Sequence, residues 1–449
     1  MGIMLENSAV CNILLEKGRL VVERLFAALE NGEQMSRVDE VARKLWLELG
    51  EDILQAMLIE LGRQIRHSDK PKPRCSRCAQ PRRFKQMRSL KVRTALTGTE
   101  REIPSPMMVC DQCSTSVLWM RELLDLDEDG FTPRLRELSV GAGTIEPFEA
   151  AAEEVLANMV GVKVSGSKIH SLCQTAGAHA EQLMEQGQLG TPRPLQPGEK
   201  LYVEMDGAML HIDGEWKETK LAIAFPQNSL APISKDRRTI THRQVCYTRD
   251  KPEQLGQRIF KMVEPYLPKT PDGAPVIAGN VVALGDGSPW IRNLTQEILP
   301  GAPFVLDWYH MDEHIAEAAR TLYPTNESER KRWTTRQENL LRDGRVDALL
   351  DGLLRKSMRL VPGSKEQQAV ADLHSYLNER RESLKYRDAR NQGLIIGSGA
   401  VESAMGYVLQ QRMKRAGMRW HGDGASAMAA LRCAYRSSEG LKTVFKMAA

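Results

Sequence analysis

Hydrophobic residues in the first part of the chain recur mostly at helical spacing. Over residues 9–66 they come every three or four positions, which predicts two amphipathic helices. Between Leu90 and Leu96 apolar and polar positions alternate instead, and a turn at Gly98 follows, which predicts a β-hairpin. Helical spacing returns over residues 147–183, where two helices are expected to flank the stretch GVKVS.

The pattern changes after a stretch rich in proline and glycine, residues 187–200, whose composition is typical of a linker. Short runs of β-branched and other apolar residues then predict strands that alternate with helices. We expect three strands at 200–212, 217–226 and 242–249, a helix at 251–267, a strand at 275–287, a helix at 289–299 and a strand at 303–310.

The last part of the chain is mostly helical in pattern. Residues 311–392 are highly charged and contain no strand candidate, which predicts a long helical insertion. A further helix is expected from Gly397, and its apolar positions form one stripe: Val401, Met405, Val408 and Leu409. The fold class is therefore multidomain α/β. The predicted parts are a helical N-terminal region (1–68), a cysteine-containing domain (69–118), a helical pair (119–186), the linker (187–200), a mixed-sheet domain in two parts (201–310 and 393–449) and the insertion (311–392).

Composition narrows the class of protein. A chain of 449 residues is too long for one ordinary core. Its 42% hydrophobic and 27% charged residues are typical of a globular protein. A formal net charge of +4 excludes a uniform polycation, so any binding of nucleic acid needs local basic patches. Because there is no run of about 18 apolar residues and no cleavable signal, we expect a cytoplasmic protein with no membrane span.

Four of the eight cysteines form two Cys-x2-Cys pairs. Cys75 and Cys78 are separated from Cys110 and Cys113 by residues 79–109. Each pair can form a tight turn that points two thiolates at one ion, and a hairpin between the pairs would bring all four thiolates together. We expect a zinc ribbon with one structural Zn²⁺; unpaired core thiols or a redox pair are the alternative.

Basic residues crowd the predicted hairpin. Between Lys72 and Arg93 there are nine lysines and arginines and no acidic residue. A small domain with such a field attracts phosphates, although a solvated basic face would have the same composition. The candidate DNA-contacting residues are Arg82, Arg83, Lys85, Arg88, Lys91 and Arg93.

The two helices expected at 147–183 fit a helix-turn-helix. Gly161 would supply the turn, and Ser165 or Ser167 would cap the second helix. Lys168 on that second helix is a candidate for DNA contact. An ordinary helical hairpin has the same pattern.

Three apolar strands are each followed by an aspartate: Asp206, Asp286 and Asp307. Glu402 lies beside the apolar stripe of the late helix. Carboxylates held at adjacent strand ends, with one more from a helix, are the ligands that two Mg²⁺ ions need. Two ions about 4 Å apart can activate a water or a 3′-hydroxyl and stabilise the leaving oxygen of a phosphodiester. Aspartate is also an ordinary turn residue, so spacing alone does not distinguish the two roles.

Four blocks carry a resemblance to a known family. They are VEMDG (203–207), ALGDGSPWI (283–291), FVLDWYHMDEHI (304–315) and GSGAVESAMGYVLQQRMKRAGMRW (397–420). In this order they resemble the catalytic region of DDE insertion-sequence transposases, closest to the Kra-type family, which is related to Mutator-like elements. The likeness runs over roughly residues 200–435, and the cysteine region with its LKVRTALTGTERE hairpin is similar to the N-terminal part of that family.

The resemblance implies an RNase H-like mixed-sheet catalytic domain that an all-helical insertion interrupts before the last acid. Asp206 on the first strand, Asp286 after the fourth and Glu402 on a late helix would be catalytic and would hold two Mg²⁺ (or Mn²⁺) ions. Asp307 and His310 match the Asp-x2-His motif of Mutator-like transposases. In this interpretation His310 positions the site or a DNA strand.

Two ligand assignments stay open. Glu204 lies on the same face of its strand as Asp206, because side chains alternate, and it could share or replace a ligand role. Asp307 could be the second ligand in place of Asp286. We prefer Asp286 because its Gly-Asp-Gly turn and its place in the strand order fit better.

A basic run without an acid follows Glu402. Its members are Arg412, Lys414, Arg415 and Arg419. These side chains could hold phosphates of a transposon end, and Trp420 could stack on a base. A solvated helix end with a core tryptophan is the alternative.

The stretch HMDEH (310–314) also fits the inverted zinc-peptidase motif H-x-x-E-H, in which Glu313 would be the base. That interpretation leaves the other three blocks unexplained. We therefore expect a transposase that binds the terminal inverted repeats of its element as a homodimer or larger assembly. It would cut the strand by Mg²⁺-assisted hydrolysis and join the 3′-hydroxyl to target DNA. A DNA-binding regulator with an inactive catalytic domain is the alternative.

Overall fold

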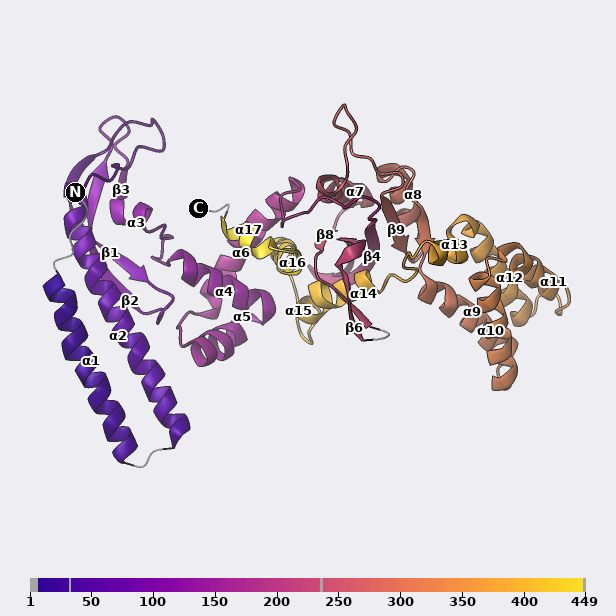
Figure 1. Ribbon diagram of the computed structural model, residues 1–449, viewed down its shortest axis with the longest axis horizontal. Helices are drawn as coiled ribbons and strands as arrows, with labels where there is room; N and C mark the ends of the chain where they lie inside the picture. Colours follow the sequence, from indigo (N-terminus) through magenta and orange to yellow (C-terminus); the bar gives the residue numbers. More distant parts are fainter. Residues whose placement is uncertain (1–6, 32–33, 235–236, 447–449) are drawn as a thin grey trace. The chain divides into compact units, whose positions relative to one another are not determined.

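The structure is a computed structural model that describes residues 7–31, 34–234 and 237–446 (Figure 1). The chain divides into two compact units, one up to Cys173 and the other from Gln174 onward. The paired cysteines therefore belong to the first unit, and the four blocks that carry the resemblance belong to the second.

The first unit begins with the two expected helices, α1 (Asn7–Glu30) and α2 (Met35–Gln64). They pack against each other through apolar side chains that recur at helical spacing, among them Val21, Leu45 and Leu49. The sequence prediction of two amphipathic helices is confirmed.

A three-stranded antiparallel sheet follows, made of β1 (Arg83–Arg93), β2 (Glu100–Val109) and β3 (Ser116–Leu118). The predicted hairpin is β1–β2, with Arg93 opposite Glu100 at its closed end. Gly98 in the connecting turn has φ +70°, and a Cβ there would lie 2.5 Å from the carbonyl oxygen of Lys163, so glycine is needed for two reasons.

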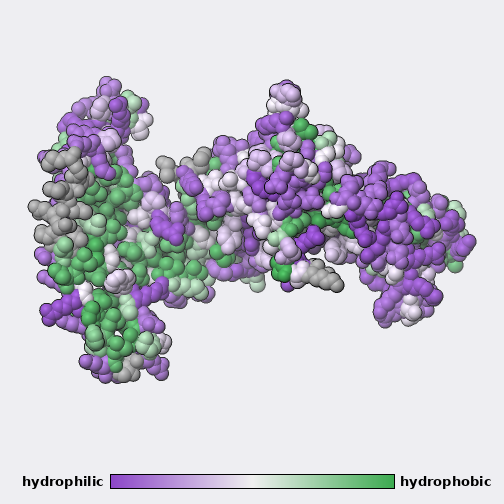
Figure 2. Space-filling model, viewed as in Figure 1, coloured by the Kyte–Doolittle hydropathy of each residue, from purple (hydrophilic) through white to green (hydrophobic). Residues whose placement is uncertain are grey.

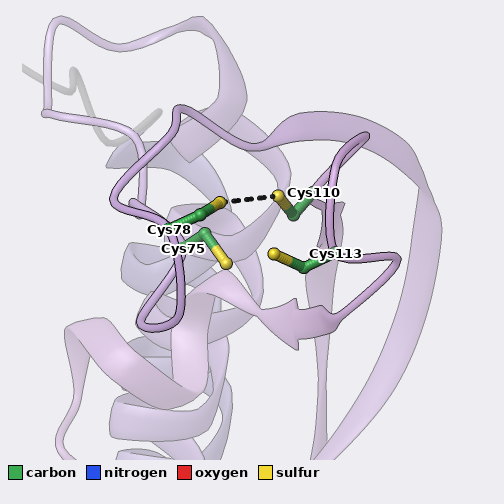
Figure 3. Close-up of side chains that lie close together, drawn as sticks. All are labelled: Cys75, Cys78, Cys110 and Cys113. Carbon is green, nitrogen blue, oxygen red and sulfur yellow. Dashed lines mark hydrogen bonds between the residues drawn. The ribbon is translucent and has the colours of Figure 1, made fainter.

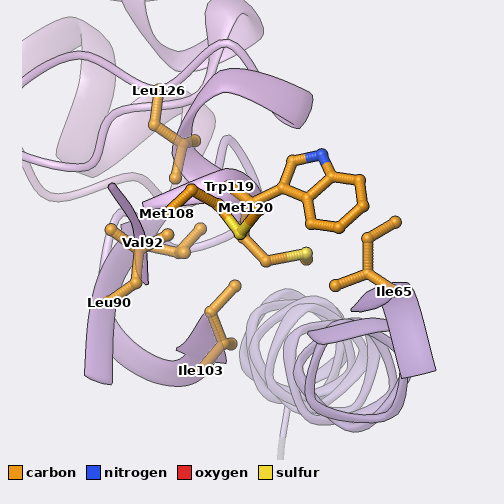
Figure 4. Close-up of a cluster of buried hydrophobic side chains, with 8 residues drawn as sticks. All are labelled: Ile65, Leu90, Val92, Ile103, Met108, Trp119, Met120 and Leu126. Carbon is orange, nitrogen blue, oxygen red and sulfur yellow. The ribbon is translucent and has the colours of Figure 1, made fainter. Parts of the chain in front are cut away.

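One face of this sheet carries the core of the first unit (Figure 4). The short helix α3 (Trp119–Leu123) follows β3 and inserts Trp119 and Met120. The end of α2 continues into a 3₁₀ turn (Ile65–His67) that adds Ile65. The sheet contributes Leu90, Val92, Ile103 and Met108, and Leu126 completes the cluster. This burial joins the helical hairpin to the cysteine-containing sheet.

The region after the sheet is helical, as expected. It contains α4 (Pro133–Ile145), α5 (Phe148–Ala150) running into a π-helical segment (Ala151–Val160), and α6 (Gly166–Glu185). Gly161 has φ +83° between the last two helices, and the Ser165 hydroxyl accepts a hydrogen bond from the Lys168 amide at 3.3 Å. The predicted turn and helix cap are therefore confirmed.

A mixed five-stranded sheet organises the second unit. Its strands are β4 (Leu201–Ile212), β5 (Glu215–Pro226), β8 (Gln244–Thr248), β9 (Val281–Gly285) and β10 (Phe304–Leu306), in the spatial order β10-β9-β4-β5-β8. β4, β5 and β8 are antiparallel neighbours, whereas β9 runs parallel to β4 and β10 runs parallel to β9. A separate hairpin, β6 (Leu230–Ser234) with β7 (Arg237–Ile240), lies between β5 and β8 in the chain.

Helices cover this sheet, as the burial of its strands requires. Every residue of β8 and β9 is buried, which is typical of strands with both faces covered. α7 (Pro252–Val263) contacts β5 and β8 and packs on α8 (Pro289–Ile298). α14 (Gly399–Met405) contacts β4 and β5, and α16 (Gly422–Arg436) contacts β8. A short last helix, α17 (Gly440–Lys446), packs on α16.

The insertion between β10 and α14 is all-helical, as predicted. Its helices are α9 (Trp308–Leu322), α10 (Glu327–Arg342), α11 (Val346–Met358), α12 (Lys365–Glu379) and α13 (Tyr386–Asn391). All of residues 311–392 are described, and none of them is in a strand. Figure 2 shows that this region has a mostly hydrophilic surface, which agrees with its highly charged sequence.

The strand expected at 200–212 is confirmed as β4, whose second half pairs with β5 after pairing with β9 stops at Glu204. Asp206 therefore lies within this strand and not at its end. Two other boundaries differ from the sequence prediction. The strand expected at 303–310 is only β10, since Asp307 caps the helix that follows. The helix from Gly399 passes through a π-helical turn (Gly406–Gln410) and ends with α15 (Gln411–Met413), so it does not reach Trp420.

The predicted linker is not a free tether. Residues 187–200 pack along the second unit, with Leu189 and Glu199 buried. The Arg193 guanidinium lies 2.7 Å from the Glu199 carboxylate, and this contact lowers the pKa of Glu199 to about 2. The boundary between the compact units lies earlier, after Cys173. Proline and glycine therefore mark an irregular but packed segment here.

Candidate functional site

β4 supplies the first two acids of the candidate site. Glu204 is fully buried at the last position where β4 pairs with β9. Asp206 lies two residues later on the same face and is only partly buried. Its Oδ1 accepts a hydrogen bond from the Gly207 amide at 2.7 Å. The end of the β9 pairing thus opens the sheet beside Asp206.

Asp286 is held in a tight turn directly after β9. Its Oδ1 accepts from the Ser288 amide and its Oδ2 from the Ser288 hydroxyl, both at 2.8 Å. The helical insertion supports this turn from outside. The Tyr376 hydroxyl donates to the Asp286 carbonyl oxygen at 3.4 Å, and Arg380 Nε donates to the Gly287 carbonyl oxygen at 3.2 Å. Sequence reasoning did not find these two insertion residues.

Asp307 joins two segments that are far apart in the chain. It is the N-cap of α9, where its Oδ2 accepts from the His310 amide at 3.2 Å. Its Oδ1 accepts from the Ser398 amide at 2.8 Å, and the Trp308 amide donates to the Ile396 carbonyl oxygen at 2.9 Å. The chain therefore enters and leaves the insertion at one clamped point, immediately before α14.

Glu204 fixes the beginning of α14. Its Oε2 accepts a hydrogen bond from the Val401 amide at 2.8 Å, and its buried Oε1 has no hydrogen-bond partner among the described residues. Glu402 is the next residue after Val401, and its side chain is exposed. The contact between Glu204 and Val401 therefore sets the position of Glu402 relative to β4.

These elements bring the predicted residues together. Ligand atoms of Asp307, His310 and Glu402 all lie within 4.8 Å of one another, a spacing compatible with a metal ion. Asp206 is close enough to interact electrostatically with Asp286, His310 and Glu402. Glu204 likewise interacts with Asp307 and Glu402. We call these six residues the acid cluster: Glu204, Asp206, Asp286, Asp307, His310 and Glu402.

Burial and mutual repulsion make the acid cluster electrostatically unusual. Burial, with a smaller contribution from Asp286, raises the pKa of Asp206 to about 6. Burial, together with nearby Asp307 and Glu402, raises the pKa of Glu204 to about 8. At neutral pH Glu204 therefore retains a proton while Asp206 is mostly charged. Carboxylate oxygens with one imidazole fit a divalent cation, which would relieve this repulsion.

The geometry does not favour the inverted zinc-peptidase motif. His310 contributes to a metal-compatible group with Asp307 and Glu402, and His314 is not part of that group. The His314 ring instead stacks on Tyr376, with ring centroids 3.9 Å apart. Burial there lowers the pKa of His314.

A second metal-compatible group lies in the first unit, where the four paired cysteines converge (Figure 3). Their ligand atoms all lie within 4.8 Å of one another, and the Sγ atoms of Cys78 and Cys110 are 3.5 Å apart. The two turns are alike. In each, the fourth residue after the first cysteine, Ala79 or Ser114, donates its amide to that cysteine's carbonyl oxygen and has positive φ.

Hydrogen bonds already favour a thiolate at this cysteine group. The Thr115 hydroxyl lies 3.5 Å from Cys75 Sγ, and this contact, with nearby backbone amides, lowers the pKa of Cys75 to about 5. The other four cysteines lie outside this group, and three of them, Cys173, Cys246 and Cys433, are buried. The four paired cysteines therefore form a metal-compatible group, as the sequence predicted.

Comparison with known protein families gives a match over almost the whole chain. A family described as an uncharacterised protein family, UPF0236, matches residues 29–447, which contain both metal-compatible groups. The chain belongs to the UPF0236 family. No curated protein matches it.

Several basic residues predicted to contact DNA have structural roles in this UPF0236 protein. Arg82 is 5% exposed and donates to the Thr115 carbonyl oxygen at 3.4 Å, beside the cysteine group. Arg412 is 1% exposed and lies over the Trp420 ring, 5.4 Å from its centroid. Lys168 pairs with Asp127 and Asp129. Burial withdraws Arg82 and Arg412 from phosphates, and charge pairing weakens the case for Lys168.

The other basic candidates are more accessible. Lys85, Arg88, Lys414, Arg415 and Arg419 are exposed. Arg83 and Lys91 are also exposed but pair with Asp111 and Glu100, and Arg93 is half-buried and pairs with Glu100 as well. No helix in the described part of the chain is long and apolar enough to cross a membrane.

Proposed function

We propose that this protein is a DDE-type transposase that binds the terminal inverted repeats of its own element and cuts and joins DNA strands with Mg²⁺. One observation carries the proposal: acids from β4, from the turn after β9 and from α14 meet at one place although the sequence separates them widely. This agrees with the resemblance, which expects the first acid on the first strand of the sheet, the second after the fourth and the third on a late helix. We accordingly assign the sheet to an RNase H-like domain.

The residues have distinct roles in this proposal. Asp206, Asp286 and Glu402 would hold two Mg²⁺ or Mn²⁺ ions, with Asp307 and His310 completing the ligand set or positioning a DNA strand. The ions would supply an activated water or 3′-hydroxyl and stabilise the leaving oxygen. Glu204, which carries a proton at neutral pH, would fix α14 so that Glu402 faces Asp206. Asp206, with a pKa of about 6, would be charged and ready to bind at pH 7.

The first unit would recognise DNA in this proposal. The four cysteines would hold one structural Zn²⁺ in a zinc ribbon, because tetrahedral thiolate sites prefer zinc. The exposed Lys85 and Arg88 on β1 would contact phosphates, and the helical pair ending in α6 would act as a helix-turn-helix. In the second unit, the exposed Lys414, Arg415 and Arg419 would bind phosphates of the element end.

We also propose that two or more copies act together, since two element ends must be cut and joined. The hairpin of α1 and α2 would be the surface that binds a second copy. It exposes several large apolar side chains, which is typical of a surface that binds another protein (Figure 2). They include Leu15, Phe26 and Trp46, which are all more than half exposed.

A strand-transfer assay tests the proposal. The substrate is a plasmid that carries the coding sequence with its natural flanking DNA, and the products are cut and joined ends formed with Mg²⁺ or Mn²⁺. Loss of a metal-binding carboxylate costs at least about 10³-fold in rate when the ion stabilises the transition state. We therefore expect Asp206→Asn, Asp286→Asn and Glu402→Gln each to reduce the products by about that factor.

Two controls make the assay decisive. Glu297→Gln removes an exposed carboxylate on α8, outside the acid cluster, and should leave the products unchanged. Asp307→Asn, compared with Asp286→Asn, identifies the second acid, because the true ligand should show the larger loss. If the parent protein and all acid-cluster variants gave equal amounts of product, the proposed transposase activity would be wrong. The alternative, a DNA-binding regulator, would then remain.

A further inference from the structure

A basic groove adjoins the acid cluster, and no predicted residue except Glu204 belongs to it. It has a volume of about 1230 Å³. The β6–β7 hairpin, the start of α9, the segment before α14 and the ends of α10, α13 and α16 line it. Glu204 lies both in the lining and in the acid cluster, so the groove and the cluster are contiguous at the beginning of α14.

The groove has a positive lining. Six arginines contribute to it: Arg237, Arg238, Arg243, Arg342, Arg390 and Arg436. Apart from Arg342, whose guanidinium lies 3.6 Å from Glu338, none of them forms an ion pair with an acid in the described residues. The buried Arg436 Nε has no hydrogen-bond partner in the part of the chain that the structure describes. Burial, with repulsion from Arg436, lowers the pKa of Arg243.

Such a group of cations is costly to hold together without an anion. Arg243 and Arg436 are half-buried, so water screens their repulsion only partly. Guanidinium groups bind phosphate oxygens through two parallel hydrogen bonds. The lining therefore favours a ligand that carries several phosphates.

Aromatic side chains accompany the arginines. Tyr309 is 64% exposed and lies on the first turn of α9, between Asp307 and His310 in the sequence. Its ring rests against Gly397, where a Cβ would lie 3.0 Å from the ring. Tyr407, which is 41% exposed, lies under the Arg436 guanidinium at 4.1 Å. Tyr309 thus presents an exposed ring, supported by Gly397, to the groove.

Exposed aromatic rings beside unpaired arginines bind nucleic acid strands whose bases are open. In a duplex the base faces are covered by stacking on neighbouring bases, so Tyr309 would have nothing to stack on. We propose that this groove binds an unpaired DNA strand, with its phosphates on the arginines and a base on Tyr309, and leads that strand to the acid cluster. This inference rests on the proposed function, because it makes the acid cluster the destination of the strand.

Binding of single-stranded DNA tests the groove without catalysis. The probe is fluorescein-labelled oligothymidylate of about six nucleotides, a usual site size for such proteins, and its anisotropy is measured with no added divalent cation over a series of salt concentrations. Arg237→Ala/Arg238→Ala should reduce the slope of log affinity against log salt by about 1.4, since each single-strand phosphate contact contributes about 0.7. Tyr309→Ala should weaken binding by about 5-fold or more, and Tyr309→Phe should bind like the parent.

A matched control removes two exposed charges elsewhere. Arg359→Ala/Lys365→Ala changes the surface of the insertion at the end of α11 and the start of α12, outside the groove, and should keep the parent salt slope. Thermal unfolding of each variant checks folding, and the arginine pair, exposed on the β6–β7 hairpin, keeps the test valid if Tyr309→Ala is unstable.

The outcomes separate this inference from the proposed function. Groove variants that bind oligothymidylate like the control would overturn it, as would an equal loss of duplex binding. If metal-dependent cutting were normal and the groove variants did not change strand binding, the proposed transposase activity would stand. Only the proposed role of the groove would be wrong. If strand binding depended on the groove but no metal supported cutting, the proposed transposase activity would be wrong. The groove would then still be a binding site for single-stranded DNA.

Discussion

At the scale of single residues, Glu204 combines burial with a structural contact. It lies inside the sheet, accepts a hydrogen bond from Val401 and retains its proton to about pH 8. The sequence predicted that Glu204 and Asp206 share one face, because side chains alternate along a strand. It did not predict their different charge states, which depend on burial by α14 and on neighbours from distant segments.

Glu204 should make stability depend on pH. The unfolded chain loses this proton near pH 4.5, whereas the folded protein keeps it to about 8, so the free energy of unfolding should fall as pH rises between these values. Glu204→Gln keeps the shape and cannot ionise, so it should gain stability relative to the parent by up to about 1.4 kcal/mol per pH unit. Urea unfolding across this range, without Mg²⁺, measures the difference.

The exposed Glu297 provides the matched comparison for this measurement. Glu297→Gln should follow the parent at every pH, because its carboxylate is exposed on α8. If Glu204→Gln also followed the parent, the buried carboxyl would not be protonated in the folded protein.

Arginine burial was the least predictable property at this scale. Arg82 and Arg412 belong to basic runs whose composition predicts an exposed surface, yet both side chains are buried. Trp420 forms an isolated β-bridge with Ile212, and this places its ring against the guanidinium of Arg412. Arg412 is therefore covered. A sequence pattern describes the neighbours along a chain, whereas these burials depend on segments that meet only in the fold.

At the scale of elements, local patterns were sufficient where local contacts determine the structure. The β1–β2 hairpin, the two cysteine turns and the cap at Ser165 follow from spacing and turn residues. The strands near Asp206, Asp286 and Asp307 were also predictable from their apolar runs, including the extension of the first of them to Ile212. Their spatial order β10-β9-β4-β5-β8 was not predicted, since it depends on pairing between segments that are far apart in the sequence.

Contact between α2 and β2 depends on a glycine. A Cβ at Gly62 would overlap the carbonyl oxygen of Pro104, which is backbone and cannot move aside easily. Gly62→Ala should therefore lower the free energy of unfolding of the first unit by about 1–3 kcal/mol. Denaturant unfolding followed by tryptophan fluorescence would report this loss through Trp119.

A second helical glycine gives the control for this prediction. A methyl group added at Gly18 in α1 would meet no atom within 4 Å, so Gly18→Ala should be neutral or stabilise by up to about 1 kcal/mol through helix propensity. Equal effects of the two substitutions would show that the close approach at Gly62 is not maintained in solution.

At the scale of the whole molecule, the two metal-compatible groups lie in different compact units. Metal bound only by the folded state stabilises the unit that holds it. Calorimetry should therefore show two transitions. Removing zinc with a chelator, or substituting Cys110→Ser, should lower one of them by at least about 4 °C. Adding Mn²⁺ should raise only the other.

Variants that remove one site at a time complete this comparison. Asp206→Asn should abolish the response to Mn²⁺ and leave the response to the chelator unchanged. If either metal shifted both transitions equally, the units would unfold as one, through the helix α6 that spans their boundary.

The clamp formed by Asp307 has a consequence for how the protein can vary. The Ser398 amide donates to Asp307, and the Trp308 amide donates to the Ile396 carbonyl oxygen, so both ends of the insertion are held at the same place. The length of the chain between these two ends therefore does not change where the insertion joins the sheet. Closing a longer loop costs little additional entropy. The helical insertion can thus become shorter, longer or different in sequence during evolution. The condition is that it still donates hydrogen bonds to the turn at Asp286, as Tyr376 and Arg380 do here.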